Sequence, residues 1–240
     1  MPERRIARDK NELQKLVKQY RDTCNLNFID TSQITDMSNL FANDKSFNCK
    51  IGNWNVSNVT DMSKMFDGAA SFNQDISGWD VSKVVFMEYM FRKAESFNQP
   101  IGSWDVSNVR WMWGMFAGAN TFNQPIGSWD VSNVRDTSEM FRDAKLFNQD
   151  ISRWNVSSVN NIKYMFHGAK RFNPRYIIPW LAKLDLSKVE AKGVFDVDPT
   201  IKTVEDLIEY LRSIDEKAVR RYLALNTTYT APLVSKTFYV

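Results

Sequence analysis

The chain has 240 residues, enough for one large domain or two ordinary ones, and its 43% hydrophobic and 25% charged residues are typical of a folded globular protein. The net charge of +3 is too small to indicate a nucleic-acid partner, and no run of about 18 apolar residues is present that would predict a transmembrane helix. One histidine and two cysteines leave little material for the commonest catalytic and zinc-binding sites, so we expect a non-enzymatic protein with no cofactor and no metal centre.

Residues 1–24 precede the first recurring pattern in the sequence. The start, Met1–Arg5, carries charges with no apolar stretch behind them, and no wall-anchoring tail is visible, so we expect a cytoplasmic protein. Apolar side chains then follow at the spacing of one helical face, namely Leu13, Leu16, Val17 and Tyr20. We expect a helix that caps the structure that follows. A helix lying on a membrane surface is the alternative.

From about residue 25 onward the same pattern recurs every 25 residues. Tryptophan occupies one position in five successive copies, Trp54, Trp79, Trp104, Trp129 and Trp154. Phe-Asn and Met-Phe pairs keep the same step, beginning with Phe47-Asn48 and Met65-Phe66. Several columns in phase over five or six copies indicate an internal repeat array.

Each copy can be interpreted as one turn of a stacked structure. Trp54 and Val56 alternate as in a short strand with one inward face, and Ser57 stands at a plausible helix start. Side chains at helical spacing follow, namely Val59, Met62, Phe66 and Ala69. The asparagine column predicts a ladder of amide side chains that satisfies backbone groups from rung to rung. We therefore predict an α/β repeat solenoid over residues 25–195, with one short strand and one short helical return per rung.

The array ends irregularly. Leu184–Val189 repeats the rung pattern with leucine in the tryptophan position, 30 residues after Trp154 instead of 25, so residues 184–195 are interpreted as a degenerate last rung. Thr203–Asp206 resembles a capping box that begins a helix, and Asp215 begins another. We expect residues 196–240 to form a helical cap or docking module, whose last four residues either add a strand or stay free.

The recurring motifs Trp-Asp-Val-Ser-Asn-Val, Met-Phe, Gly-Ala and Phe-Asn-Gln cover about residues 25–173. They resemble the repeats of the BspA-like leucine-rich-repeat surface proteins, a family of 25-residue repeats. The resemblance implies a leucine-rich-repeat-like solenoid that binds proteins, often at the bacterial cell surface. The cell surface is therefore the alternative location.

An acidic column lies beside the tryptophan column, formed by Asp80, Asp105 and Asp130. Paired carboxylates can bind a cation or act as acid and base. Because Asn55 and Asn155 hold the same position in other copies, we expect these side chains to cap strand edges instead.

Cys24 and Cys49 are one repeat apart and so occupy equivalent positions on adjacent rungs. Stacked strands lie about 4.8 Å apart, a separation that allows a disulfide between the two cysteines. In a cytoplasmic protein we predict free thiols, with the bridge reserved for an exported one.

In a repeat protein the recurring positions maintain the fold, so a binding site is sought where the copies differ. Trp111 and Trp113 lie off the tryptophan column, in positions that outer copies fill with polar residues such as Asp61 and Ser138. Together with variable neighbours they form our candidate partner-binding set: Val85, Phe86, Tyr89, Arg110, Trp111, Trp113 and Arg135. Exposed aromatic residues with arginine dominate protein interfaces.

The same set has an alternative interpretation, in which local packing or the terminal helices cover it. Phe86 and Trp111 share a column and are expected to be neighbours on adjacent rungs. Trp111 and Trp113 share a side if their segment is extended and lie on opposite sides if it is helical, and the sequence leaves this open.

Three function classes follow. The first is a non-enzymatic scaffold that binds another protein through the variable aromatic and basic positions. The second is an intracellular effector or inhibitor that binds and blocks a host or viral protein. The third, a binder of single-stranded nucleic acid, is disfavoured because residues 31–173 hold 14 basic and 14 acidic side chains and so form no electrostatic funnel.

Overall fold

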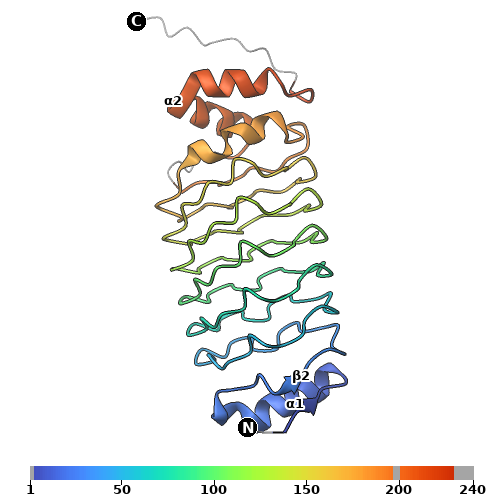
Figure 1. Cartoon of the computed structure of the whole chain (residues 1–240). Helices are drawn as coiled ribbons and strands as arrows, with labels where there is room; N and C mark the ends of the chain where they lie inside the picture. Colours follow the sequence, from blue (N-terminus) through green and yellow to red (C-terminus); the bar gives the residue numbers. More distant parts are fainter. Residues whose placement is uncertain (1–2, 197–200, 230–240) are drawn as a thin grey trace, which may run out of the picture.

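The computed structural model describes residues 3–196 and 201–229, and its main body is an elongated stack of successive chain turns (Figure 1). We call each turn a rung. Parallel bridges join consecutive rungs in one column, the bridge column, which runs through Asp36, Asp61, Phe86, Trp111, Asp136, Asn161 and Glu190. Within the described residues only β1 (Arg5–Ile6) and β2 (Ile29–Asp30) are strands, so each rung after the first contributes bridge residues rather than a strand.

The return side of each rung consists of turns where we expected a short helix. Met65 donates its N–H to the carbonyl of Met62 (3.1 Å), which closes one turn, and Lys64 has a positive φ of 56°, which interrupts a helical path. The next N–H that a helix would need, that of Phe66, bonds instead to the carbonyl of Met90 on the following rung (2.9 Å). The helical spacing of the apolar residues therefore arises from successive short turns.

Tryptophan and phenylalanine fill the inside of the stack. The five tryptophans of the repeat column are only 1–4% exposed. Each indole N–H donates to a backbone carbonyl 28 positions earlier, as Trp79 does to Ile51 (3.3 Å). Phe66, Phe91 and Phe116 stack along the axis with ring centroids 5.5 and 5.6 Å apart. The core is therefore aromatic, and its polar indole groups are satisfied by the backbone of the preceding rung.

The expected asparagine ladder runs along the stack. The backbone N–H of Asn98 donates to Oδ1 of Asn73 (3.0 Å), and that of Asn123 donates to Oδ1 of Asn98 (2.9 Å). The side-chain amides of Gln99 and Gln124 reach the same two oxygens (2.9 and 3.0 Å). Each of these oxygens thus accepts two hydrogen bonds from the next rung, which links the rungs in addition to the bridge column.

The N-terminal end is closed by α1 (Lys10–Tyr20), the helix expected from the apolar spacing. Asp9 caps α1 by accepting the N–H of Glu12 (2.8 Å), and Leu13 and Val17 are buried. Strand β1, which we did not expect, pairs in parallel with β2 at this end. A strand of two residues is too short to show a recognisable alternation of apolar and polar residues in the sequence.

In the last rung, the sequence prediction that Leu184 occupies the tryptophan position is wrong. The inserted segment forms the 3₁₀ helix η2 (Pro174–Ala182), in which the indole of Trp180 donates to the carbonyl of Ile151 (3.1 Å). Its ring lies 6.0 Å from that of Trp154. Trp180, and not Leu184, therefore fills the tryptophan position of this rung, because η2 carries it onto the end of the tryptophan column.

The C-terminal end is covered by α2 (Val204–Leu223) (Figure 1). Thr203 and Asp206 form the expected capping box, and the helix breaks at Asp215, whose side chain accepts the N–H of Ala218 (3.0 Å). The predicted start of a second helix at Asp215 is confirmed, because Asp215 is non-helical and caps the helical segment that follows, so that α2 consists of two helices joined at a kink.

The chain after α2 is fastened to the last rung. The side-chain amide of Asn226 donates to the carbonyls of Leu181 (2.6 Å) and Leu184 (2.8 Å). The part of the expected C-terminal module at 197–200 and 230–240, including its last four residues, lies outside the described residues.

Candidate partner-binding surface

The outer surface along the bridge column, which we call the bridge face, changes character at its middle. Asp36, Asp61 and Asp136 each accept the backbone N–H of the serine two residues later, at 2.7–2.8 Å. Phe86 and Trp111 occupy the same column but carry no side-chain acceptor. Two central rungs therefore have aromatic rings in place of side chains that stabilise their own turns.

Phe86 and Trp111 are bridge partners on adjacent rungs, as expected from their shared column. The N–H of Met87, next to Phe86, donates to the carbonyl of Trp111 (3.0 Å). Phe86 is 39% exposed, and among the described residues only Ile6 and Leu225 are large hydrophobic residues with greater exposure. An exposed ring in the middle of an otherwise buried hydrophobic array is the kind of feature that marks an interaction site.

Trp111 and Trp113 lie on the same side of their segment. Met112 between them is fully buried, whereas both tryptophans are half-buried. The backbone is extended here, because Met112 donates to Asp136 on the next rung (3.2 Å) and Trp113 accepts from Tyr89 on the preceding one (3.0 Å). The question that the sequence left open is thus settled in favour of an outward aromatic pair.

Tyr89 is held between two neighbours. Its ring meets that of Trp113 edge to face, with centroids 4.1 Å apart, and the guanidinium of Arg92 lies 4.2 Å from its centroid. Arg92 is itself fixed by two hydrogen bonds to the carboxylate of Asp67 (2.7 and 2.6 Å). Burial raises the pKa of the Tyr89 phenol above its ordinary value. The ring is therefore neutral and restrained, which lowers the entropy that binding would cost.

Arg110 and Arg135 lie one rung apart beside the aromatic residues. The N–H of Arg135 donates to the carbonyl of Arg110 (3.0 Å), and both side chains are exposed. Among the described residues neither guanidinium takes part in an ion pair, in contrast to Arg92 and Arg142. Two adjacent cations are thus available to an anionic group.

Val85 completes the candidate set. It is half-buried, its N–H donates to Thr60 (2.9 Å) and its carbonyl accepts from Arg110 (3.0 Å). The structure therefore brings all seven candidate residues onto the bridge face of three consecutive rungs.

Glu88 lies in the same surface and was not among the residues predicted from the sequence. It occupies the column of Ser63 and Trp113, and its Oε2 atom is buried with no hydrogen-bond partner in the described part of the chain. Burial raises the pKa of Glu88, and the negative charge of Asp61 adds to the effect. The sequence signal that could have identified Glu88 is a glutamate in a column that adjacent copies fill with serine or tryptophan.

The acidic column beside the tryptophans stabilises turns. Its members accept the backbone N–H of the serine two residues later at 3.0–3.1 Å, and these are Asp80, Asp105 and Asp130. Asn55 does the same for Ser57 (3.1 Å), and the residues after Ser57 form turns, so Ser57 does not begin a helix. The hydrogen bonds from serine lower the pKa of Asp80 and Asp130. In the described residues no three potential metal ligands among His, Cys, Asp and Glu come together.

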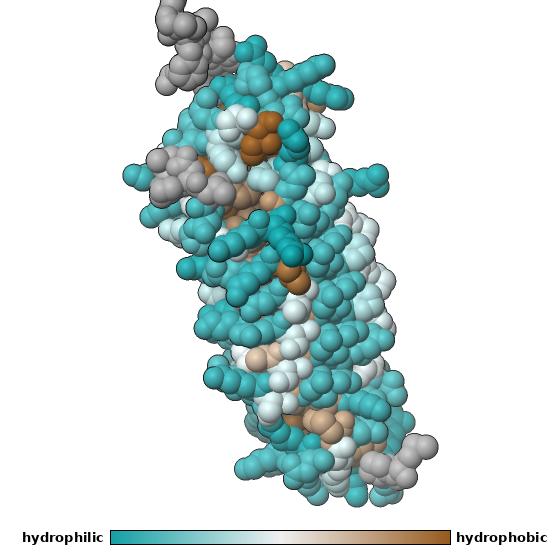
Figure 2. Space-filling view, turned by 90° about the vertical axis from the view of Figure 1, so that its left-hand side faces the viewer, coloured by the Kyte–Doolittle hydropathy of each residue, from teal (hydrophilic) through white to brown (hydrophobic). Residues whose placement is uncertain are grey.

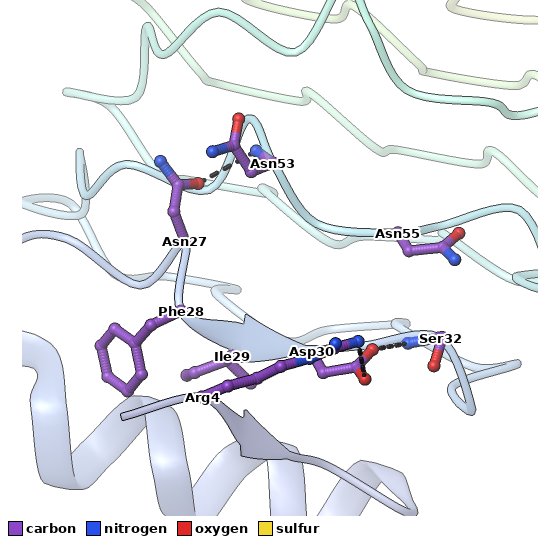
Figure 3. Close-up of a pocket in the computed structure, with 8 residues that line it drawn as sticks. All are labelled: Arg4, Asn27, Phe28, Ile29, Asp30, Ser32, Asn53 and Asn55. Atoms are coloured by element: carbon purple, nitrogen blue, oxygen red, sulfur yellow. Dashed lines mark hydrogen bonds and ion pairs between the residues drawn. The ribbon is translucent and has the colours of Figure 1, made fainter. Parts of the chain in front are cut away.

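A separate pocket of about 360 Å³ lies at the N-terminal end (Figure 3). Its charged lining residues, Arg4 and Asp30, are paired with each other, and Asp30 also accepts the N–H of Ser32 (3.0 Å). The N–H of Asn53 donates to Oδ1 of Asn27 (3.0 Å). These lining groups bind one another, so we assign no ligand to this pocket.

The terminal helices leave the central rungs open. Helices α1 and α2 lie at opposite ends of the stack (Figure 1). The face in Figure 2 is mostly hydrophilic, with hydrophobic surface only in small separate areas. The described terminal helices therefore do not cover the bridge face at Phe86 and Trp111.

The chain belongs to the family described as "Mycoplasma protein of unknown function, DUF285", whose model matches residues 11–115 and 98–196. The two matches together cover α1 from its second residue, the repeat array and η2. No curated protein and no solved structure matches the chain. Within residues 3–196 and 201–229, no helix combines the length and apolar character needed to cross a membrane.

Proposed function

We propose that this chain is a non-enzymatic repeat scaffold that binds another protein through the bridge face of its central rungs. The binding residues are Val85, Phe86, Tyr89, Arg110, Trp111, Trp113 and Arg135. The observation that carries the proposal is the pair of the exposed Phe86 and the half-buried Trp111, which replaces turn-capping aspartates in the bridge column. The replacement gives up a local hydrogen bond on two rungs and exposes apolar surface, and a bound partner compensates for both.

The fold that presents this surface is, in our proposal, a leucine-rich-repeat-like solenoid of the BspA-like type. A continuous column of parallel bridges and a continuous aromatic core support it. Such stacks present long, regular faces on which a few variable residues can define a binding site.

The charge around the aromatic residues indicates an acidic partner. Arg110 and Arg135 are exposed and form no ion pair with described residues, and they lie beside Trp111 in sequence and across rungs. A partner segment that places an apolar side chain on Phe86 and carboxylates against the two guanidinium groups would match this surface. We therefore propose an acidic protein segment with at least one apolar anchor as the ligand.

A random-peptide display library tests this proposal, because it samples acidic and apolar segments of every composition and does not require the natural partner. The full chain is the bait, and recovered peptides are re-tested on two variants, Trp111→Asn with Trp113→Ser, and Arg110→Glu with Arg135→Glu. The first variant gives the rung residues that other rungs already use, Asn161 and Ser138, so we expect it to fold as the unsubstituted chain does. Asp36→Asn, in the same column but far from the aromatic residues, is the matched control.

The proposal predicts peptides rich in Asp, Glu and apolar residues that bind the unsubstituted chain and Asp36→Asn equally and lose binding to both test variants. Peptides that bind the charge-reversed variant as well as the unsubstituted chain would exclude the acidic ligand. Peptides that bind the tryptophan variant undiminished, or a library that yields no binder, would contradict the proposed surface.

A further inference from the structure

Cys24 and Cys49 face each other across the first two rungs. Their Sγ atoms are 2.9 Å apart, and both thiols are free. The backbone around them is already paired, because Lys50 donates to the carbonyl of Cys24 (3.0 Å) and Leu26 donates to that of Lys50 (2.9 Å). A disulfide bond is about 2.05 Å long, so the two sulfurs need to approach by less than about 1 Å.

The two cysteines occupy a column that links rungs elsewhere in the stack. In later rungs this column holds glutamines whose side-chain amides donate to the asparagine Oδ1 of the preceding rung at 2.9–3.0 Å, namely Gln74, Gln99, Gln124 and Gln149. The first rung has Thr23 where that asparagine would stand. The cysteine pair therefore lies at the junction that lacks the polar link.

This junction also connects the N-terminal cap to the array. The 3₁₀ turn η1 (Arg21–Thr23) follows α1 directly, and Cys24 ends it with a left-handed φ of 49°. The thiol of Cys49 contacts the carbonyl of Arg21 at 3.5 Å. A covalent bond between the two sulfurs would tie α1 and η1 to the second rung.

We propose that Cys24 and Cys49 form a thiol–disulfide exchange site, at which a low-molecular-weight disulfide such as oxidised glutathione converts the pair into a disulfide that fastens the N-terminal cap. This site is independent of the proposed partner-binding surface, and it adds a covalent modification that the scaffold function does not require.

The reaction proceeds in two steps. The exposed Cys24, as thiolate, attacks one sulfur of the small disulfide, whose S–S bond breaks and releases one small thiolate. Cys49 then gives its proton to solvent, and its sulfur attacks the Cys24 sulfur and expels the second small thiolate, which takes up a proton. Two protein thiols are thereby oxidised by two electrons, and the small disulfide is reduced to two thiols.

The burial of Cys49 governs the second step. Burial and the neighbouring Cys24 raise the pKa of Cys49 to about 12. Burial is the largest cause and persists after Cys24 has reacted, so Cys49 stays mostly protonated at neutral pH, and ring closure is expected to be the slower step and to accelerate with rising pH.

The test incubates the reduced, full-length chain with oxidised glutathione and measures its intact mass and its free thiols after denaturation. The proposal predicts a monomer that has lost both thiols and two hydrogens and that retains no glutathionyl group. A stable glutathionyl adduct, a disulfide-linked dimer or two remaining thiols in the unsubstituted chain would each overturn it.

Two variants separate the roles of the cysteines. Cys49→Ser is expected to stop at one glutathionyl group on Cys24, and Cys24→Ser is expected to leave the buried Cys49 unmodified while the protein is folded. Circular dichroism checks that both variants fold. Modification of Cys49 in folded Cys24→Ser as fast as that of Cys24 in Cys49→Ser would overturn the order of the two steps.

Hydrogen exchange tests the structural consequence. Oxidation is expected to slow amide exchange in α1 and η1 by about tenfold or more, and to leave rungs at residues 98–148 unchanged. Equal exchange in α1 before and after complete oxidation would show that the disulfide does not fasten the cap.

Discussion

The ring of Tyr89 lies directly over Gly114 of the next rung, so that a β-carbon on this glycine would collide with the tyrosine ring. The same relationship recurs nearer the C-terminus, where a β-carbon on Gly193 would lie 2.5 Å from Cε1 of Tyr164. Gly114 also has a φ of +61°, which residues with a side chain adopt at a cost. The absence of a side chain at Gly114 thus positions Tyr89 against Trp113 on the bridge face.

Gly114→Ala is therefore expected to destabilise the chain more than Gly118→Ala. Both glycines have a positive φ, which costs an alanine about 1 kcal/mol. At Gly118 a β-carbon makes only ordinary contacts with Lys93, the nearest being Cγ at 3.4 Å, whereas at Gly114 it adds an overpacking cost of about 1–3 kcal/mol. Urea unfolding measures the two free energies of unfolding.

The Tyr89→Ala background is the control for this comparison. Without the tyrosine ring, the two glycine substitutions are expected to differ by less than about 0.5 kcal/mol. A difference that persists in this background would show that Tyr89 is not the cause.

Substitutions of two tryptophans of one rung are expected to differ strongly in their cost to stability. Trp104 is 4% exposed and its indole donates to the carbonyl of Ile76 (3.2 Å), so Trp104→Ala is expected to cost about 3–5 kcal/mol of unfolding free energy. Trp111→Asn loses half-buried surface but gains an acceptor for the N–H of Trp113, as Asn161 accepts that of Lys163 (3.1 Å). We expect a change of less than about 1 kcal/mol.

Chemical denaturation measures both variants. A loss at Trp111→Asn as large as that at Trp104→Ala would mean that Trp111 belongs to the core. The proposed binding surface would then lose its central residue.

The asparagine ladder makes a separate prediction about hydrogen bonding. Oδ1 of Asn123 accepts the N–H of Asn148 and the side-chain amide of Gln149, both at 2.9 Å. Asn123→Ala removes this acceptor and is expected to cost about 1–3 kcal/mol, because the N–H of Asn148 loses its partner. Asn123→Asp keeps the acceptor and is expected to cost less. Thermal and urea unfolding compare the two, and equal losses would show that the Oδ1 acceptor is not what matters.

The features that repeat were predictable from the sequence. A tryptophan or an asparagine at one position of five or six copies must occupy equivalent surroundings, so the burial of the tryptophans and the amide ladder follow from the 25-residue period. The pairing of Phe86 with Trp111 follows for the same reason, because both lie in one column. The seven candidate residues were found as departures from that pattern.

Features that occur only once in the chain were not predictable from the sequence. The same holds for the turns, whose apolar residues have the spacing of a helix. Successive turns with positive φ angles, as at Lys64, give apolar residues the same spacing as a helix, so the expected helical returns are turns. Trp180 reaches the tryptophan column only because η2 folds, which no period reveals. Glu88 was missed because its significance depends on burial, and a single substitution in a polar column does not indicate burial.

The buried carboxyl of Glu88 makes stability depend on pH. Its pKa is raised from the usual 4.5, mainly by burial, so the charged form is disfavoured in the folded chain. This cost is fully present above the folded pKa and disappears as the pH falls below the unfolded value. Glu88→Gln is therefore expected to be more stable than the unsubstituted chain near pH 7, with a difference that vanishes below about pH 4.

Unfolding midpoints at the two pH values measure this effect. Glu95→Gln, an exposed carboxyl on the next turn of the same rung, is the control and is expected to change little at either pH. A Glu88→Gln variant that is less stable near pH 7 would show that the carboxylate stabilises the folded chain.

Calorimetric titration of a library-selected acidic peptide tests the proposed function most directly. Each hot-spot tryptophan is worth at least about 1.4 kcal/mol, a factor of ten, so Trp111→Asn with Trp113→Ser is expected to weaken binding about a hundredfold or more. Asp36→Asn is expected to bind as the unsubstituted chain does. An affinity of the tryptophan variant within about twofold of the unsubstituted chain would contradict the assignment of the bridge face as the binding surface.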